Sequence, residues 1–281
     1  MEIRLHRELA EFAALTNVLY AADPVTHTVA LTVLAQRLGA LGPADVGTLL
    51  TVHEGAAVVG AALRTPPWPL AVSGLPEGAA EPAVGVLLAH DRGLDLVGGP
   101  SPRAEAFADA WCAATGASAR TVVAHRLFRL DELTPPSRVP GRARRAGVAD
   151  LGLALRWQRA FAAAAVPDAP EPTREQVRRQ LSGAGATVLW EVAGAPVAMA
   201  RASEPAVGMS RVSAVYTPPA LRGRGYGSAV TAAASRWALD AGVRDVVLFT
   251  DLANPVSNAI YPRLGYRPVH DAVQLALVPT A

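Results

Sequence analysis

The order of apolar segments in residues 187–251 limits the folds that this chain can adopt. Two apolar runs flank Gly194-Ala195-Pro196, which predicts a β-hairpin, and a third strand is predicted at 208–217. An amphipathic helix follows at 227–242, and then a continuous apolar strand at 244–251 that is typical of a buried parallel pairing. Because a hairpin is antiparallel, these segments together predict an α/β fold with a mixed, mostly antiparallel sheet.

The first half of the chain repeats this plan more faintly. Helical patterns at 5–21 and 26–38 precede apolar runs that predict a hairpin about Glu54-Gly55. A third strand, a helix, a further strand and the helical pattern of 100–116 then follow in the same order as in the second half. The shared order and spacing indicate a duplicated fold.

A proline-rich segment separates the two halves. Pro135, Pro136 and Pro140 disfavour both helices and strand ladders, which predicts extended and exposed chain. The basic run within 142–145 is expected to be a solvated edge. The sequence therefore predicts a domain at 1–132, a linker at 133–147 and a second domain at 148–281.

Composition argues against several classes of protein. The formal net charge of +2 is too small to indicate a nucleic-acid partner. Apolar runs stay below the roughly 18 residues that span a bilayer, and the first residues carry charges where a signal peptide is apolar. No membrane partner and a cytoplasmic location are therefore expected. The single cysteine, Cys112, permits no intrachain disulfide, and the six histidines show no zinc spacing, so no metal site is expected.

The stretch "ALRGRGYGSA" at 220–229 joins the third strand to the long helix. A helix start leaves backbone N–H groups without partners and carries partial positive charge, and glycine lets a ligand approach those groups closely. With Arg222 and Arg224 beside them, these amides predict an anion site suited to phosphate or diphosphate.

Three other interpretations of this stretch stay open from the residues alone. A dinucleotide-binding turn needs Gly-x-Gly-x-x-Gly, whereas the glycines fall at 223, 225 and 227, although Asp251 ends the next strand as a ribose-binding acid would. A disordered Arg-Gly segment for nucleic acid would lack the strand and helix that adjoin this stretch. A glycine-rich loop with solvated arginines would need no ligand.

Two motifs resemble the GNAT superfamily of N-acetyltransferases. Residues 222–227 fit Arg/Gln-x-x-Gly-x-Gly/Ala, the acyl-CoA diphosphate loop of that family. Residues 254–266 are similar to its pattern Asn-x-x-Ser/Ala-x-x-x-Tyr-x-x-x-Gly-Phe/Tyr. The resemblance is close over 186–277 and architectural over 1–130. It implies two GNAT-like domains in tandem, the first degenerate, each with a mixed sheet whose middle strands splay apart and are flanked by helices.

The resemblance also implies acetyl-CoA as co-substrate. Its diphosphate would bind the loop amides, and its pantetheine arm would pair with the strand at 208–217, where the amide of Val215 or Tyr216 would polarise the thioester carbonyl. Asn254 and Tyr261 each have a structural alternative, an N-cap before Pro255 and a core tyrosine. The implied cofactor-binding residues are Ala214, Val215, Tyr216, Arg222, Gly223, Arg224, Gly225, Tyr226, Gly227, Ser228, Asn254, Ser257 and Tyr261.

The resemblance places Tyr261 at the family's usual general-acid position, where it would protonate the departing CoA thiolate. The general base stays open, because many GNAT enzymes use a carboxylate on the strand that corresponds to 208–217, and that strand has none. Asp251 is the first candidate, with Glu191 and Glu204 as alternatives. An amine of low pKa would also lose its proton to water unaided.

These features together predict an acyltransferase that moves an acetyl group from acetyl-CoA to an amine of a small molecule or peptide, by direct attack in a ternary complex. The two copies are expected to pack as an internal pseudo-dimer, which makes a monomer, with a homodimer as the alternative. A module that binds acyl-CoA without transferring the acyl group is the alternative function, and a dinucleotide-binding protein is a further one.

Overall fold

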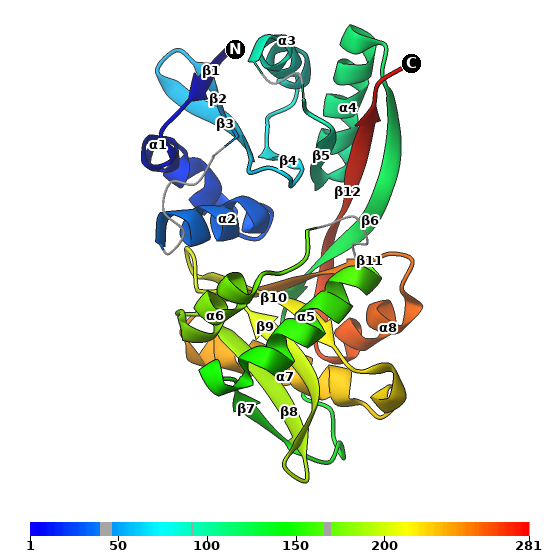
Figure 1. Cartoon of the computed structure of the whole chain (residues 1–281). Helices are drawn as coiled ribbons and strands as arrows, with labels where there is room; N and C mark the ends of the chain where they lie inside the picture. The colour runs from blue at the N-terminus through cyan, green and yellow to red at the C-terminus, as the bar shows by residue number, and fades with distance from the viewer. Residues whose placement is uncertain (40–46, 91–92, 166–169, 281) are drawn as a thin grey trace. The chain divides into compact units, whose positions relative to one another are not determined.

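The computed structural model describes residues 1–39, 47–90, 93–165 and 170–280. The chain forms two compact units (Figure 1). Unit 1 comprises Met1–Arg126 together with His270–Ala281, and unit 2 comprises Leu127–Val269.

Unit 1 is a mixed sheet with helices packed on it. Its strands lie in the order β1-β2-β3-β4-β5, with β4 and β5 parallel and the other pairs antiparallel. Apolar side chains of α3 and α4, among them Leu87 and Phe107, form one core with the strands. The elements are β1 (Glu2–His6), α1 (Leu9–Ala22), α2 (Thr28–Gly39), β2 (Thr48–Glu54), β3 (Ala57–Arg64), β4 (Leu70–Gly74), α3 (Ala80–His90), β5 (Leu96–Pro100) and α4 (Ser101–Thr115).

Unit 2 repeats this order with a parallel pair at the same place. Its strands lie in the order β7-β8-β9-β10-β11, and only β10 and β11 are parallel. The elements are β7 (Arg142–Arg145), a 3₁₀ turn (Val148–Asp150), α5 (Leu151–Ala165), α6 (Arg174–Ser182), β8 (Ala186–Val192), β9 (Ala195–Ala202), β10 (Met209–Tyr216), a 3₁₀ turn (Pro219–Leu221), α7 (Tyr226–Asp240), β11 (Asp245–Asp251) and α8 (Pro255–Arg263).

The two faces of the unit 2 sheet pack against different helices. Successive side chains of a strand point to opposite faces. Val188 and Ala200 accordingly join the core formed with α7 and α8, whereas Leu189 and Met199 join the core formed with α5 and α6. A side chain's place along β8, β9 or β10 therefore decides which pair of helices it meets.

Two long strands, β6 (Ser118–Leu130) and β12 (Tyr266–Val278), have residues in both units. Residues 272–276 of β12 pair antiparallel with β5 in unit 1. The far end of β6 belongs to unit 2, where β6 is the neighbour of β11 and Phe128 joins the core. Each sheet is thus completed by the strand that ends the other half of the chain.

The predicted α/β fold with mixed sheets is confirmed, and the bounds of its parts differ from those expected. Sequence order assigned β12 to a domain at 148–281, whereas its pairing with β5 puts residues 270–281 in unit 1. The segment 133–147, predicted as a linker, contains β7, which pairs with β8. A helix predicted from Leu5 begins at Leu9, because residues 2–6 alternate as a strand and pair with β2.

The basic run of 142–145 forms an edge strand whose Arg142 and Arg145 are exposed, as expected, but two of its arginines are also bonded to the body of unit 2. Arg144 makes ion pairs with Asp150 at 2.7 Å and with Glu191 at 2.6 Å. Arg145 donates to the carbonyl oxygens of Gly183 and Gly185. These bonds tie the edge strand β7 to the body of unit 2.

Candidate active site

The loop between β10 and α7 turns at two glycines with positive φ. After the 3₁₀ turn Pro219–Leu221, Gly223 has φ 77° and Gly225 has φ 83°, values that other residues adopt only with strain. Gly225 is the N-cap of α7, and a Cβ there would come within 2.9 Å of Val139 Cγ2. The backbone therefore turns into the helix at two positions that favour glycine by their φ angles, and at Gly225 a Cβ would also be crowded.

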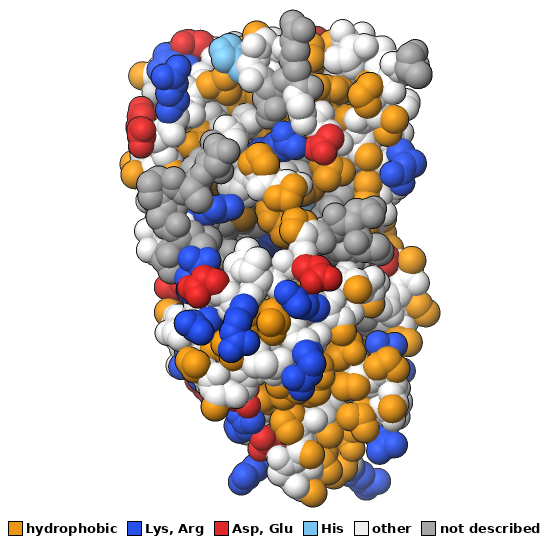
Figure 2. All heavy atoms as spheres, in the orientation of Figure 1, with side chains coloured by type: hydrophobic (Ala, Val, Ile, Leu, Met, Phe, Trp, Pro, Cys, Tyr) orange, Lys and Arg blue, Asp and Glu red, His pale blue; other side chains and the backbone are white. Residues whose placement is uncertain are grey.

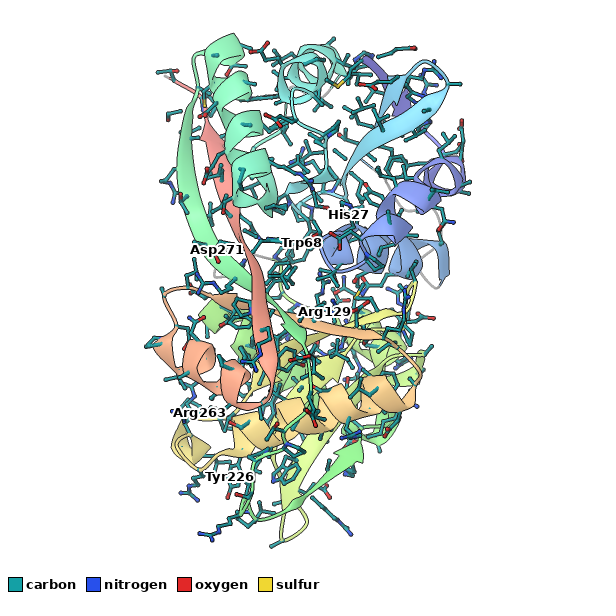
Figure 3. All side chains as sticks on the ribbon, turned by 180° about the vertical axis from the view of Figure 1, so that it is seen from behind. His27, Trp68, Arg129, Tyr226, Arg263 and Asp271 are labelled. Atoms are coloured by element: carbon teal, nitrogen blue, oxygen red, sulfur yellow. The ribbon has the colours of Figure 1, made fainter. Side chains whose placement is uncertain are left out.

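The backbone amides at the start of α7 are free. Within the described residues, the N–H groups from Gly223 to Ser228 donate no hydrogen bond, and the first bond of the helix joins Ala229 N to Gly225 O at 3.0 Å. The helix dipole adds partial positive charge at the same end. Tyr226 lies at this helix start (Figure 3), and because its side chain is buried in the core, only its amide is offered to a ligand.

Arg222 and Arg224 add positive charge to the same loop. Both side chains are exposed. Arg222 Nε donates to Thr217 O at 3.1 Å, which closes the loop on itself. Salt screens exposed charges, so these arginines supplement the free amides and do not replace them.

β10 and β11 pair over only part of their length. Their parallel ladder runs from the Met209–Asp245 pair to the Val212–Leu248 pair and stops there, although both strands continue. The ladder of β10 with β9 is irregular just beyond this point, and Ala214 has φ 49°. Past Val212, the edge of β10 that faces β11 has no strand partner among the described residues.

α8 begins at an asparagine cap and contains a buried tyrosine. The Asn254 side chain accepts from Ser257 N at 3.1 Å, so the N-cap role considered for Asn254 is confirmed. Tyr261 is 7% exposed, and its ring centroid lies 6.0 Å from those of Phe128 and Tyr266. Burial raises the pKa of Tyr261 to about 12, although a hydrogen bond with the Ser257 side chain acts in the opposite direction.

These three elements meet in one apolar cluster. Leu221 and Tyr226 from the loop and helix start, Val215 from β10 and Tyr261 from α8 all belong to it. The loop, β10 and α8 therefore share one hydrophobic core of unit 2.

Residues 154–266 match the model of the acetyltransferase (GNAT) family. They contain the loop, the splayed strands and α8. This part of the chain is a GNAT domain.

Solved structures resemble the chain beyond the GNAT domain. A Drosophila protein gives a TM-score of 0.68 at 14% identity, over 99% of each chain. A GNAT-family acetyltransferase from Colwellia psychrerythraea gives 0.63 at 12% identity, over 99% of this chain and 100% of that one. A GCN5-related N-acetyltransferase from Kribbella flavida gives 0.59 at 22% identity, over 93% and 96%. These identities show the fold alone, which is that of two GNAT-like units in tandem. No match was found among curated proteins.

The candidate bases of the GNAT domain differ in their surroundings. Asp251 is exposed at the end of β11, and its Oδ1 accepts from Ala253 N at 2.8 Å. Glu191 is buried, and its carboxylate forms an ion pair with Arg144 at 2.6 Å. Glu204 is exposed. Of these three, Asp251 alone lies on one of the two splayed strands.

Two features of the GNAT domain escaped sequence reasoning. One is the positive φ of Ala214, because an alanine in a sequence gives no sign of a left-handed backbone. The other is the pair Arg201 and Arg211, whose side chains have no bonding partner among the described residues. The sequence signal for both residues was a charged side chain within a mainly apolar strand.

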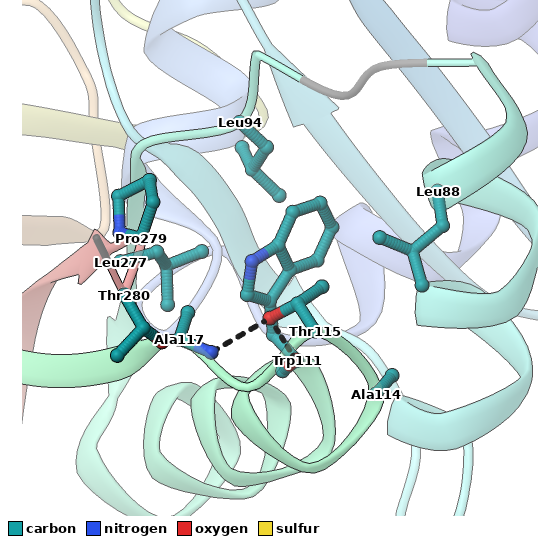
Figure 4. A pocket seen from close by; sticks show the side chains of 9 residues that line it. All are labelled: Leu88, Leu94, Trp111, Ala114, Thr115, Ala117, Leu277, Pro279 and Thr280. Atoms are coloured by element: carbon teal, nitrogen blue, oxygen red, sulfur yellow. Dashed lines mark hydrogen bonds between the residues drawn. The ribbon is translucent and has the colours of Figure 1, made fainter.

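A separate pocket of about 470 Å³ lies in unit 1 and contains none of the predicted site residues (Figure 4). It is lined mainly by apolar side chains, among them Trp111, Leu88 and Leu277.

Among the described residues, no group of histidine, cysteine or acidic side chains is arranged to hold a metal, and none of the helices described is long and apolar enough to cross a bilayer.

Proposed function

We propose that the GNAT domain transfers an acetyl group from acetyl-CoA to an amine of a small molecule or peptide in a ternary complex. The observation that carries this proposal is the row of free amides from Gly223 to Ser228 at the N-terminus of α7. Bare amides at a helix start are suited to a diphosphate, and CoA contains one.

The chain's own groups would place the thioester beside β10. Past Val212 that strand offers an unpaired edge, to which the amide groups of the pantetheine arm would bond as an added strand. A backbone N–H of Val215 or Tyr216 would then donate to the thioester carbonyl oxygen, where negative charge develops as the amine attacks. The C–N bond forms, the C–S bond breaks, and the amine gives up a proton.

Tyr261 would act on the departing sulfur by hydrogen bonding. A hydroxyl with a pKa of about 12 keeps its proton at neutral pH. A thiol has a pKa of roughly 8.5, so complete proton transfer from Tyr261 to the thiolate is unfavourable. The hydroxyl would therefore stabilise the thiolate as a donor, and the sulfur would take its proton from solvent.

Asp251 would receive the amine proton. It is exposed and lies at the end of the strand that borders the gap. The bond it accepts from Ala253 N uses one oxygen, which leaves the other free. Water would serve instead for an amine that is already neutral.

Thiol release distinguishes transfer from binding alone. Purified full-length protein would be titrated with CoA by calorimetry, and then mixed with acetyl-CoA and a panel of amines while free thiol is measured. Binding with amine-dependent thiol release supports the enzyme. Binding of CoA without thiol release in the presence of any amine would support the alternative, a CoA-binding module. Binding of NAD but not of CoA would reject both functions.

A further inference from the structure

Two arginines on one face of the unit 2 sheet have no counter-charge within the part of the chain that the structure describes. Arg201 lies on β9 and Arg211 on β10, and neither side chain has an ion pair or hydrogen bond with any described residue. Arg201 Nε is fully enclosed without a partner. Burial lowers the pKa of both groups to about 10, with the charge of Arg211 adding to the effect at Arg201, so both stay charged at neutral pH.

These arginines differ from those on the surface. Figure 2 shows arginines gathered over α5 and α6, where water solvates them and Arg159 pairs with Glu171 at 3.2 Å. A charge taken out of water without a partner is costly. Uncompensated charge of this kind is typical of a binding site and not of a structural core.

The register brings hydroxyl groups beside the arginines. Arg201 is directly opposite Thr187 on β8 and Ser213 on β10, and Arg211 lies two residues before Ser213, so all four share one face. Thr187 Oγ1 is buried and has no hydrogen-bond partner within the described residues. The Arg211 backbone is fixed by bonds of its N and O atoms to Ser203.

The acids around this face are already engaged. Asp245 on β11 lies 2.7 Å from Arg129, and Glu191 on β8 is held by Arg144. On α5, Gln158 bonds to Gln180 at 2.9 Å. Within the described residues, none of these groups neutralises Arg201 or Arg211, which leaves their charges open to an external anion.

We propose that Arg201 and Arg211, with Thr187 and Ser213, bind an oxyanion group, carboxylate or phosphate, of the acceptor amine. This inference rests on the proposed function. Ser213 is the first β10 residue past the ladder with β11, so the arginine face lies about two residues, or ~7 Å, from the edge proposed for the thioester. That spacing fits an amine with its anionic group a few bonds away, as in an amino acid or an aminoalkyl phosphate.

The test compares matched acceptors with labelled acetyl-CoA: an amino acid against its amide, and phosphoethanolamine against ethanolamine. The wild type is expected to prefer at least one anionic acceptor by tenfold or more in kcat/KM. Arg201→Met and Arg211→Met should remove that preference with CoA affinity unchanged, whereas Arg178→Met, on the exposed face of α6, should not. Equal kcat/KM values of the wild type for anionic and neutral acceptors would overturn the inference. So would an equal loss of kcat/KM on both kinds of acceptor in the Arg201→Met and Arg211→Met variants.

A binding measurement decides the matter even without turnover. With saturating CoA occupying the loop, calorimetric titration with inorganic phosphate and with acetate should show binding that Arg201→Met and Arg211→Met abolish and Arg178→Met keeps. Arg201→Met should also raise the melting temperature, because it removes a half-buried charge whose enclosed Nε has no partner among the described residues. No anion binding in the wild type, or a lower melting temperature for Arg201→Met, would refute the oxyanion site. Absence of thiol release alone would refute only the proposed transfer.

Discussion

The two units place a loop and a helix after equivalent strands, yet only one of these helix starts suits an anion. In unit 2 the loop of 217–225 leads to α7, whose first amides are free. In unit 1 the loop of 75–79 leads to α3, where Leu75 N and Ala79 N already bond to Val72 O and Pro76 O. A shared fold therefore does not conserve the site.

Sequence chemistry explains the difference. Pro76 and Pro82 have no N–H to offer at the start of α3, and Glu77 and Glu81 add negative charge there. The strands differ too, because a Cβ on Gly99 of β5 would lie 3.0 Å from Val72 Cγ2 and 3.4 Å from Ser73 N on β4. Among the described residues, the start of α3 thus offers fewer N–H donors than the start of α7, places acidic side chains beside them, and has less room between β4 and β5.

Of the changes considered, Gly227→Glu should have the largest effect on CoA binding, the property that distinguishes unit 2 from unit 1. It puts a negative charge among the free amides and should weaken CoA binding by at least 100-fold. Gly227 has no positive φ, and an added Cβ would lie 3.6 Å from Thr217 Oγ1, an ordinary contact. Because an acid at a helix start is favourable, the melting temperature should not fall.

Two controls accompany this variant. Gly227→Gln adds similar bulk without charge and should cost less affinity. Gly85→Glu puts the same charge on α3, where a Cβ meets nothing within 4 Å, and should leave CoA binding unchanged. Equal loss from Gly85→Glu would contradict the assignment of CoA to unit 2.

Tyr261→Phe should lower kcat by about 10- to 100-fold, because a hydrogen bond to a charged atom is worth roughly 1.5–3 kcal/mol. CoA affinity should change by less than about twofold. In unit 1, α4 follows β5 as α8 follows β11, but its buried face presents Phe107 and Trp111, which have no hydroxyl. Steady-state kinetics and calorimetry check both values, and an unchanged kcat would remove Tyr261 from the mechanism.

Arg222→Met and Arg224→Met should each weaken CoA binding by about two- to tenfold at low salt. Both residues are exposed, so screening should reduce the loss at high salt. Measuring CoA affinity at two ionic strengths separates the contribution of the arginine charges from that of the backbone amides. A loss that persisted at high salt would mean that the guanidinium groups, and not the amides, hold the diphosphate.

The smallest effects concern one ion pair in each unit. Hydrogen bonds from Arg144 hold the pKa of Asp150 below its usual value, and those from Arg126 do the same for Asp271. A lowered pKa stabilises the fold above the pKa of the unfolded carboxyl, and that stability is lost as pH falls below about 4. The Asp150 side chain is 16% exposed against 42% for Asp271.

Asp150→Asn should therefore cost about 1–2 kcal/mol at pH 7 and Asp271→Asn less than about 1 kcal/mol. Denaturant unfolding at pH 7 and pH 3 checks this, and both differences should shrink at pH 3. A larger loss of unfolding free energy for Asp271→Asn than for Asp150→Asn would contradict the prediction that the more buried ion pair contributes more stability.

The sequence predicted the repeated elements well because local patterns encode them. The two apolar runs in 187–203 predict β8 and β9, and the amphipathic pattern at 227–242 predicts α7. It did not predict that β12 pairs with β5, because strand partners far apart in sequence leave no local trace. Nor could it show the partial ladder between β10 and β11.

Side-chain environments were the least predictable part of the site. Tyr261 was expected from a motif, but its burial, and hence its raised pKa, depends on Phe128 and Tyr266 from other strands. Glu191 was an alternative candidate for the general base, but its carboxylate is in an ion pair with Arg144 on the edge strand. Arg201 and Arg211 become neighbours only once β9 and β10 pair.

A crystal structure of the full chain with CoA tests the central claim most directly. We expect diphosphate oxygens within about 3.2 Å of amide nitrogens between Gly223 and Ser228, and the pantetheine arm against β10 past Val212. A diphosphate bound elsewhere, with those amides bonded to carbonyl oxygens of the chain, would contradict the account.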